Sequence, residues 1–420
     1  MSTEEPPAGA ESGAGAGAEA TGADDGGQAR IRVARAALTR LMEPSDLAGL
    51  ALVRAVGPVD ALAIIEGTLE APRGLERSMT SILVDSGAAG SGWPGLADAL
   101  GRWRPRVKDA APERDLAVIA ALGGGLLYPE HPLWPPALAD LDLAEPIALW
   151  VRSATAALPP LGSCVAIVGS RDSTSYGASV TSEMAYALAQ RGLTIVSGGA
   201  FGIDAQAHRA ALTGAGPGCL PTIAVMAGGL DRYYPAGNED LLRAIAHQGA
   251  LVAEVPPGAS STRYRFLQRN RIIAALSVAT VVVEARWRSG ALNTAHHAEG
   301  LGRVVAAVPG SVYSANSAGC HRLLREGAAV CVTDAAEVAE LAGASGEALV
   351  PEPLQQAAIH DGLSVEDLLL FDALPLTTGT TVDKLSVVAG LPPAAVLAGL
   401  GRLELMALAQ RGNGLWKRRR

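Results

Sequence analysis

An arginine-rich segment at residues 262–271 has the strongest chemical bias in this sequence of 420 residues. It reads T-R-Y-R-F-L-Q-R-N-R, with four arginines, two aromatic residues and no acidic residue. Guanidinium groups can neutralise consecutive phosphates while the ring of Tyr264 or Phe266 stacks on an unpaired base. The segment therefore predicts a contact with single-stranded nucleic acid. The alternative is a solvated helix face, which would not explain why balancing Glu or Asp residues are missing.

Glycine-rich turns follow three apolar runs and could bind anions. Gly169-Ser170-Arg171 comes directly after the run 165–168, and free backbone N–H groups, a hydroxyl and a planar arginine together suit phosphate. Ser197-Gly198-Gly199 and Gly228-Gly229 repeat this device after later runs, and Arg232 could extend it. Three such turns at one sheet edge predict a phosphate-binding surface. The alternative at each is a plain tight turn.

Other kinds of chemistry have weaker support. The turns carry no G-x-G-x-x-G and the chain has no G-x-x-x-x-G-K-[ST], which weakens dinucleotide and P-loop interpretations. Asp204 and His208 could be an acid/base pair, but no nucleophile motif stands beside them, so we expect a structural helix pair. We expect no catalytic residue, no metal and no cofactor. Four scattered cysteines are expected to be small buried side chains in a reducing cytoplasm: Cys164, Cys219, Cys320 and Cys331.

The elements that must position these residues alternate between strand and helix. Apolar runs typical of strands buried on both faces recur between helical segments through 164–341. This alternation predicts a doubly wound, mostly parallel α/β sheet, in which ligands bind at the carboxyl ends of the strands. The glycine-rich turns fall at those ends. Strands are predicted at 165–168, 194–196, 222–226, 250–253, 280–284, 304–308 and 330–332.

Shifts in composition divide the chain into further parts. The first residues are Ala, Gly, Glu and Asp, which predicts a solvated, disordered tail. Gly57-Pro58 separates two helical stretches. We interpret it as a turn in a helical packing module, and the alternative is a hairpin between two helices that contacts the DNA backbone. Three helices and a hairpin around 411–413 predict a winged helix near the C-terminus. The expected order is a tail (1–30), a small helical domain (31–112), an α/β domain (113–342) that begins with a connector (113–162), a linker (343–362), a winged helix (363–416) and a basic tail (417–420).

The overall composition limits the possible partners. Hydrophobic residues make up 49% and charged residues 18% of the chain, as in a protein with a large buried core. The formal net charge of −8 gives no global attraction to nucleic acid, so any such binding must come from a local basic patch. We expect no apolar run of membrane-spanning length and find no basic, apolar leader, which predicts a cytoplasmic protein without membrane association.

Seven ordered motifs resemble the DprA (Smf) family of DNA-processing proteins of natural transformation. The match runs along most of residues 115–335. The motifs are V-G-S-R at 168–171, S-G-G-A-F-G-I-D-A-Q-A-H at 197–208, G-G-L-D-R-Y-Y-P at 228–235, R-N-R-I-I-A-A-L-S at 269–277, S-G at 289–290, T-A at 294–295 and V-P-G at 308–310.

This resemblance implies an extended Rossmann-like fold that binds single-stranded DNA, protects it and loads the RecA recombinase, without catalysis. It also implies a homodimer, which we expect to form through the end of the domain that holds 304–308 and 330–332. By its motif, Arg171 is implied as a phosphate contact. Asn270 is implied as a candidate contact because it lies in the motif R-N-R-I-I-A-A-L-S. The candidate contacts to single-stranded DNA are Gly169, Ser170, Arg171, Ser197, Gly198, Gly199, Arg232, Arg263, Phe266, Arg269, Asn270 and Arg271.

Two other functions remain open at this point. One is a nucleotide-cleaving enzyme or nucleotide sensor on a related fold, for which Glu284 and Ser289-Gly290 fall in a comparable region, although no P-G-G-x-G-T motif is present. The other function is sequence-specific binding of double-stranded DNA by the winged helix. Its third helix, predicted at 394–404, has only Arg402 and Glu404 as charged residues and is poorly equipped to read a major groove.

Overall fold

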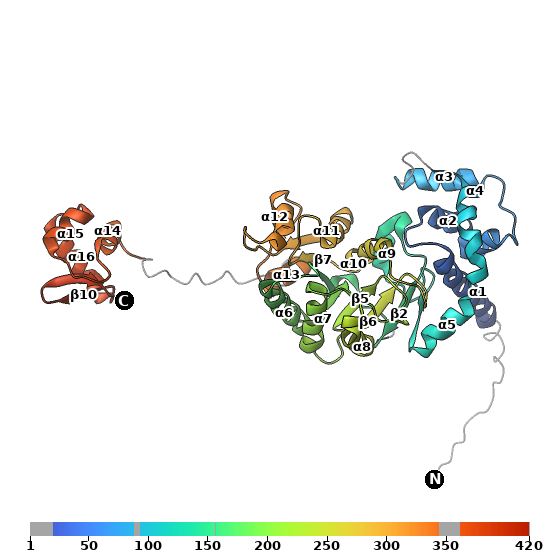
Figure 1. Cartoon of the computed structure of the whole chain (residues 1–420), viewed down its shortest axis with the longest axis horizontal. Helices are drawn as coiled ribbons and strands as arrows, with labels where there is room; N and C mark the ends of the chain where they lie inside the picture. The colour runs from blue at the N-terminus through green and yellow to red at the C-terminus, as the bar shows by residue number, and fades with distance from the viewer. Residues whose placement is uncertain (1–19, 88–92, 156, 344–361, 420) are drawn as a thin grey trace, which may run out of the picture. The chain divides into compact units, whose positions relative to one another are not determined.

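The computed structural model describes residues 20–87, 93–155, 157–343 and 362–419 (Figure 1). The chain forms two compact units, one within residues 1–350 and one within 351–420. The first holds a helical part and the predicted α/β sheet, and the second holds the C-terminal helices and hairpin. The predicted linker falls almost entirely outside the described residues, as do residues 1–19 of the predicted tail.

The α/β part is built on a nine-stranded sheet of order β1-β2-β6-β5-β4-β3-β7-β8-β9. From β6 to β9 all neighbours in this order are parallel, whereas β1 and β2 add antiparallel strands at one edge. The predicted fold class is therefore confirmed. The strands are β1 Gly124–Leu127, β2 Leu149–Ser153, β3 Cys164–Val168, β4 Thr194–Gly198, β5 Thr222–Met226, β6 Ala250–Ala253, β7 Ala279–Val282, β8 Val304–Ala307 and β9 Val330–Cys331.

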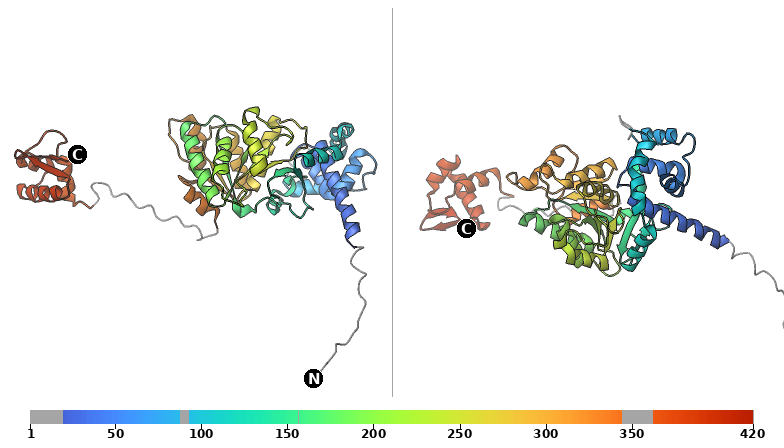
Figure 2. Two further views of the ribbon diagram at one scale, coloured as in Figure 1. Left: turned by 90° about the horizontal axis from the view of Figure 1, so that it is seen from below. Right: turned by 45° about the vertical axis from the view of Figure 1, so that its right-hand side comes forward.

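Helices cover both faces of this sheet because its central strands are apolar on both sides (Figures 1 and 2). In β3, Val165 and Ile167 pack in one core cluster and Ala166 and Val168 in another, as the alternation of side chains along a strand requires. The helices of this part are α6 Ser175–Gln190, α7 Ile203–Gly214, α8 Glu239–Gln248, α9 Arg263–Gln268, α10 Asn270–Ala275, α11 Gly290–Gly300, α12 Ala318–Arg325 and α13 Ala335–Ala342.

The strand order reverses at β3, which positions the site. From β3 the chain adds β4, β5 and β6 on one side and then β7, β8 and β9 on the other. The loops that follow β3 and β7 therefore diverge, and their divergence leaves a crevice at the carboxyl ends of these two strands. The turn Gly169-Ser170-Arg171 lies on one side of this crevice and the loop 283–289 on the other.

The N-terminal helices differ from two sequence expectations. Residues 20–30 were expected to be disordered, but the first helix begins at Ala20. The helix Leu47–Glu66 is long and apolar enough to cross a membrane, contrary to the expectation that no run reaches this length. It is kinked at Gly57, where φ is 80°, and Leu52 and Ile64 are among its side chains in the core of the helical part. The helices are α1 Ala20–Leu41, α2 Leu47–Glu66, α3 Leu75–Asp85, α4 Leu96–Trp103 and α5 Pro112–Ala121.

The C-terminal unit has the elements predicted for a winged helix, in the predicted order. Its hairpin turns at Asn413-Gly414, both with positive φ, as in a type I′ turn, whereas Arg411 and Gly412 lie in the strand. The elements are α14 Val365–Ala373, α15 Val382–Ala389, α16 Pro393–Leu405, β10 Ala409–Gly412 and β11 Leu415–Arg418.

The cysteines divide into two groups, which corrects another expectation. Cys164 and Cys320 are buried, as predicted, but Cys219 and Cys331 are exposed. No group of three His, Cys, Asp or Glu residues in the described part of the chain could hold a metal ion.

Candidate nucleic-acid interface

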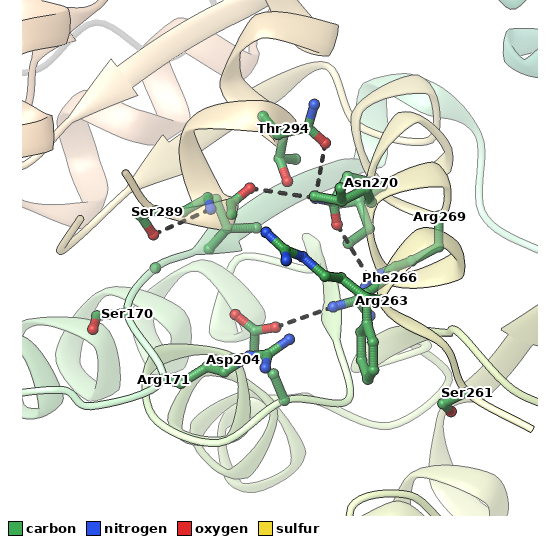
Figure 3. A pocket seen from close by; sticks show the side chains of 18 of the residues that line it. Ser170, Arg171, Asp204, Ser261, Arg263, Phe266, Arg269, Asn270, Ser289 and Thr294 are labelled. Atoms are coloured by element: carbon green, nitrogen blue, oxygen red, sulfur yellow. Dashed lines mark hydrogen bonds and ion pairs between the residues drawn. The ribbon is translucent and has the colours of Figure 1, made fainter. Parts of the chain in front are cut away.

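A pocket of about 740 Å³ occupies the crevice between the carboxyl ends of β3 and β7. Five segments line it: the turn after β3, the loop after β4 with the start of α7, Tyr234 in the loop after β5, the arginine-rich segment with α9 and α10, and the loop after β7 with the start of α11. Figure 3 shows Arg171, Arg263 and Asp204 pointing into a common space. The charged lining residues are Arg171, Arg263, Arg269, Arg286, Arg288 and Asp204.

The turn after β3 is held close to its neighbours. A Cβ atom on Gly169 would lie 2.6 Å from Ile203 Cγ1 and 2.9 Å from the Glu284 carbonyl oxygen, so only glycine fits. The Ser170 N–H donates to the Glu284 carbonyl oxygen at 2.7 Å, and the Ser170 carbonyl accepts from the Ile203 N–H at 3.1 Å. The adjacent Arg171 is exposed on this fixed backbone.

Phe266 lies among cationic and aromatic groups at the pocket wall. The Thr262 hydroxyl caps α9 and so sets the direction of the helix that carries Phe266. The Phe266 ring centroid lies 4.9 Å from the Arg171 guanidinium carbon and 5.9 Å from the Tyr234 ring centroid. The side chain is half-buried. One part of the ring is therefore packed and another part is accessible to a ligand.

Arg269 and Asp204 form the buried floor of the pocket. Arg269 Nη2 lies 3.7 Å from Asp204 Oδ2, and Arg269 Nη1 donates to the Val225 carbonyl oxygen. Burial raises the pKa of Asp204 to about 6, against the lowering effect of Arg269 and Arg171. Burial also lowers the pKa of Arg269, which Asp204 counteracts. The floor therefore contributes less positive charge than the number of arginines suggests.

The first turn of α11 forms the opposite wall. Ser289 is its N-cap, and Gly290 and Ala291 line the pocket. Asn270 Nδ2 donates to the Gly290 carbonyl oxygen at 3.3 Å and to Asn293 Oδ1 at 3.1 Å. Asn270 thus joins α10 to α11, and the N-terminal end of α11 favours an anion in the pocket.

The predicted contact residues divide between the pocket and the protein interior. Seven of them come together as lining residues: Gly169, Ser170, Arg171, Arg263, Phe266, Arg269 and Asn270.

The second and third glycine turns do not extend the phosphate-binding surface, which corrects that prediction. The buried Ser197 hydroxyl donates to the Ile167 carbonyl oxygen, Gly198 lies against the Arg269 guanidinium, and a Cβ atom on Gly199 would lie 2.8 Å from Met226 Sδ. Gly228 and Gly229 pack against residues 256–261. Arg232 is exposed but is not among the lining residues of the pocket.

Arg271 is not available to DNA, contrary to the prediction. It is 2% exposed, and its two terminal nitrogens each donate to a Glu254 carboxylate oxygen at 2.7 Å. Its Nε donates to the Ala144 carbonyl oxygen at 3.0 Å. The balancing acids that seemed to be missing come from other elements, since Glu43 likewise pairs with Arg265 at 2.8 Å.

Asp204 and His208 have separate partners rather than each other. His208 is fully buried, with Nδ1 at 2.6 Å from Thr222 Oγ1 and Nε2 at 3.0 Å from the Gly198 carbonyl oxygen. Burial lowers the pKa of His208 to about 4, so the ring is neutral near neutral pH. Its role is structural, as expected, but it forms no pair with Asp204.

Sequence reasoning missed two of the lining arginines. Arg286 and Arg288 flank Trp287 in the loop after β7, and both line the pocket. The available indication was R-W-R-S-G a few residues after a buried strand, in a loop at the same edge of the sheet as the arginine of V-G-S-R after β3. Glu284 just before them lines a different pocket, of about 610 Å³, and both its carboxylate oxygens accept hydrogen bonds from Thr174.

The fold and the site define a doubly wound α/β protein with an arginine-lined pocket where the strand order reverses. Residues 125–343, more than half of the chain, match the family model described as DNA recombination-mediator protein A. The chain belongs to this family, and the predicted resemblance is confirmed.

Individual relatives agree with this assignment. A DNA processing protein DprA of Mycobacterium tuberculosis is 42% identical over 390 residues, which cover 90% of this chain and 92% of the relative. A protein Smf of Synechocystis is 32% identical over 328 residues, covering 70% and 80%. The X-ray structure of DNA processing protein A from Streptococcus pneumoniae matches with a TM-score of 0.53 and 26% identity, over 74% of this chain and 96% of that one.

Proposed function

We propose that this protein binds single-stranded DNA in the arginine pocket and mediates recombination without catalysing a reaction. The observation that carries the proposal is the charge balance of the pocket: five arginines and one carboxylate line it together with the half-buried ring of Phe266. The lining residues in the described part of the chain include no histidine, cysteine or lysine. Charge neutralisation and stacking are therefore the chemistry that the pocket supports best.

We assign different roles to the residues around the pocket. Arg171 and Arg263 are exposed and neutralise phosphates, while Phe266 stacks on an unpaired base. Arg269 and Asn270 are buried and hold the walls together. Arg232, which lies outside the pocket, contacts the strand beyond it.

The cellular role that we propose is protection of incoming single strands and loading of the RecA recombinase, in the cytoplasm and without membrane association. Family membership supports this role. We further propose a homodimer through the β8–β9 end of the sheet. Support for it is the edge strand β9, where Val330 is 51% exposed. Sedimentation that finds only monomer at micromolar concentration would contradict the dimer.

The proposed function is tested by comparing labelled single- and double-stranded oligonucleotides of the same sequence across a salt series. Tighter binding of the single strand is expected, and its log–log salt slope should be about −0.7 per phosphate neutralised. A flat salt response, or equal affinity for the duplex, would contradict the proposal.

A nucleotide-cleaving activity is the less supported alternative. Its candidate carboxylate, Glu284, is buried and accepts hydrogen bonds from Thr174 on both oxygens, outside the arginine pocket. Incubation with nucleoside monophosphates distinguishes the two functions. Release of free base would favour the enzyme, and unchanged nucleotide is expected here.

A further inference from the structure

Trp287 is an exposed tryptophan at the edge of the arginine pocket. The chain has six tryptophans, of which Trp103, Trp134, Trp150 and Trp416 are buried and Trp93 is partly buried. Trp287 is 52% exposed and stands between Arg286 and Arg288, which both line the pocket. A large apolar ring left open at this place is unexplained by packing.

The loop that carries Trp287 is fixed by hydrogen bonds. The Ala285 N–H donates to the Asn316 carbonyl oxygen at 2.7 Å, and the Gly319 N–H donates to the Ala285 carbonyl oxygen at 2.7 Å. Arg286 Nε donates to Asn316 Oδ1 at 2.8 Å, and its Nη2 donates to Asp172 Oδ2 at 2.9 Å. The ring is therefore presented on a preorganised support, which reduces the entropy cost of binding.

A cationic group lies against this ring, as others lie against Phe266. The guanidinium carbon of Arg322, on α12, lies 5.3 Å from the Trp287 ring centroid. Arg288 is exposed and forms no hydrogen bond or ion pair with other described residues. Arg171 is placed in the same way beside Phe266, at 4.9 Å. Arg288 thus lines the pocket without a partner among the described residues and directly follows Trp287 in the chain.

We propose that Trp287 is a second base-stacking position, and that a single strand leaving the pocket crosses Arg288 and lies over Trp287 toward α12. This inference rests on the proposed single-strand binding in the pocket. Arg288 neutralises a phosphate, and the indole face accepts an unpaired base. Only strands longer than the pocket reach Trp287, so it adds affinity for long oligonucleotides and none for short ones.

The proposal is tested by measuring how tightly Trp287→Ala and Trp287→Phe bind labelled oligo-dT of about 6 and about 20 nucleotides. These two lengths span common single-strand site sizes. Trp287→Ala should weaken the long strand about 5- to 150-fold, the range for one stacked base, and leave the short strand unchanged. Trp287→Phe should keep most of the affinity. It should also abolish the quenching of intrinsic fluorescence that long oligo-dT produces in the natural protein.

Tyr313→Ala is the matched control, because Tyr313 is 96% exposed but does not line the pocket. It should bind both oligonucleotides like the natural protein. If Arg171→Ala weakens both lengths while Trp287→Ala weakens neither, the pocket binds DNA and the second position is wrong. If Trp287→Ala lowers only the sedimentation coefficient of the free protein, Trp287 belongs to a protein interface and the proposal is overturned. If the natural protein fails to bind either oligonucleotide, this inference and the proposed function both fail.

Discussion

The adjacent helices α9 and α10 come from one arginine-rich segment but have opposite surroundings. None of the residues of α9 is buried, whereas every residue of α10 is buried. Arg263 on α9 lines the pocket and is exposed, while Arg271 on α10 is paired with Glu254 inside the protein. The comparison teaches that a run of arginines can serve two purposes. Some stay exposed at the pocket, and others neutralise the protein's own carboxylates.

The largest effect is expected on stability, for Arg271→Ala. Removing one partner of a buried ion pair leaves Glu254 as an uncompensated charge, which should cost about 3–5 kcal/mol of unfolding free energy. Denaturant unfolding measures this loss. Arg263→Ala is the matched control from the exposed helix and should change stability by no more than about 0.5 kcal/mol. If both variants unfold like the natural protein, the contrast between the two helices is wrong.

Arg171→Ala should give the next largest effect, on binding rather than on stability. The loss of a charged phosphate contact should cost about 1.5–3 kcal/mol of binding free energy. All sequences should be weakened alike, and the salt slope should become shallower by about 0.7. Titrations at several salt concentrations check this. Arg243→Ala removes another exposed arginine, on α8 and outside the pocket, and should leave binding unchanged.

Phe266→Ala tests whether the half-buried ring serves DNA or packing. Loss of one stacked base should cost about 1–3 kcal/mol of single-strand binding, with little change for duplex. A core phenylalanine would instead cost about 3–5 kcal/mol of stability. Binding and the thermal midpoint are therefore measured on the same sample. A large drop in the midpoint, or equal loss on single and double strands, would identify Phe266 as a packing residue.

The smallest effect concerns the pH dependence of binding. The pKa of Asp204 is raised to about 6, so its carboxylate is mostly ionised at pH 7.5 and repels phosphate. A bound phosphate would raise this pKa further, so binding takes up a proton. Affinity should therefore rise severalfold as the pH falls toward 6, and level off below it.

Asp204→Asn removes the titrating group and should bind more tightly at pH 7.5, with affinity almost independent of pH between 6 and 8. His208 does not interfere, since its pKa of about 4 keeps it neutral over this range. An unchanged pH profile in the variant would exclude Asp204 as the cause.

The sequence alone determined most strands of the sheet and part of the pocket. The strands predicted at 222–226 and 250–253 are β5 and β6, because continuous apolar runs between helical segments fit only strands buried on both faces. Arg171, Arg263 and Phe266 were predicted and line the pocket. Arg171 does so because the loop after a parallel strand lies at the carboxyl edge of the sheet, where ligands bind.

Only the tertiary structure decided which charges are free. Glu254 lies 17 residues from Arg271, and Glu43 lies 222 residues from Arg265, so the local sequence does not reveal these partners. The same holds for Arg286 and Arg288, which enter the pocket because β7 pairs with β3. Burial of a charge is costly unless a partner is brought to it, and packing of distant segments determines which arginines are paired and which remain for a ligand.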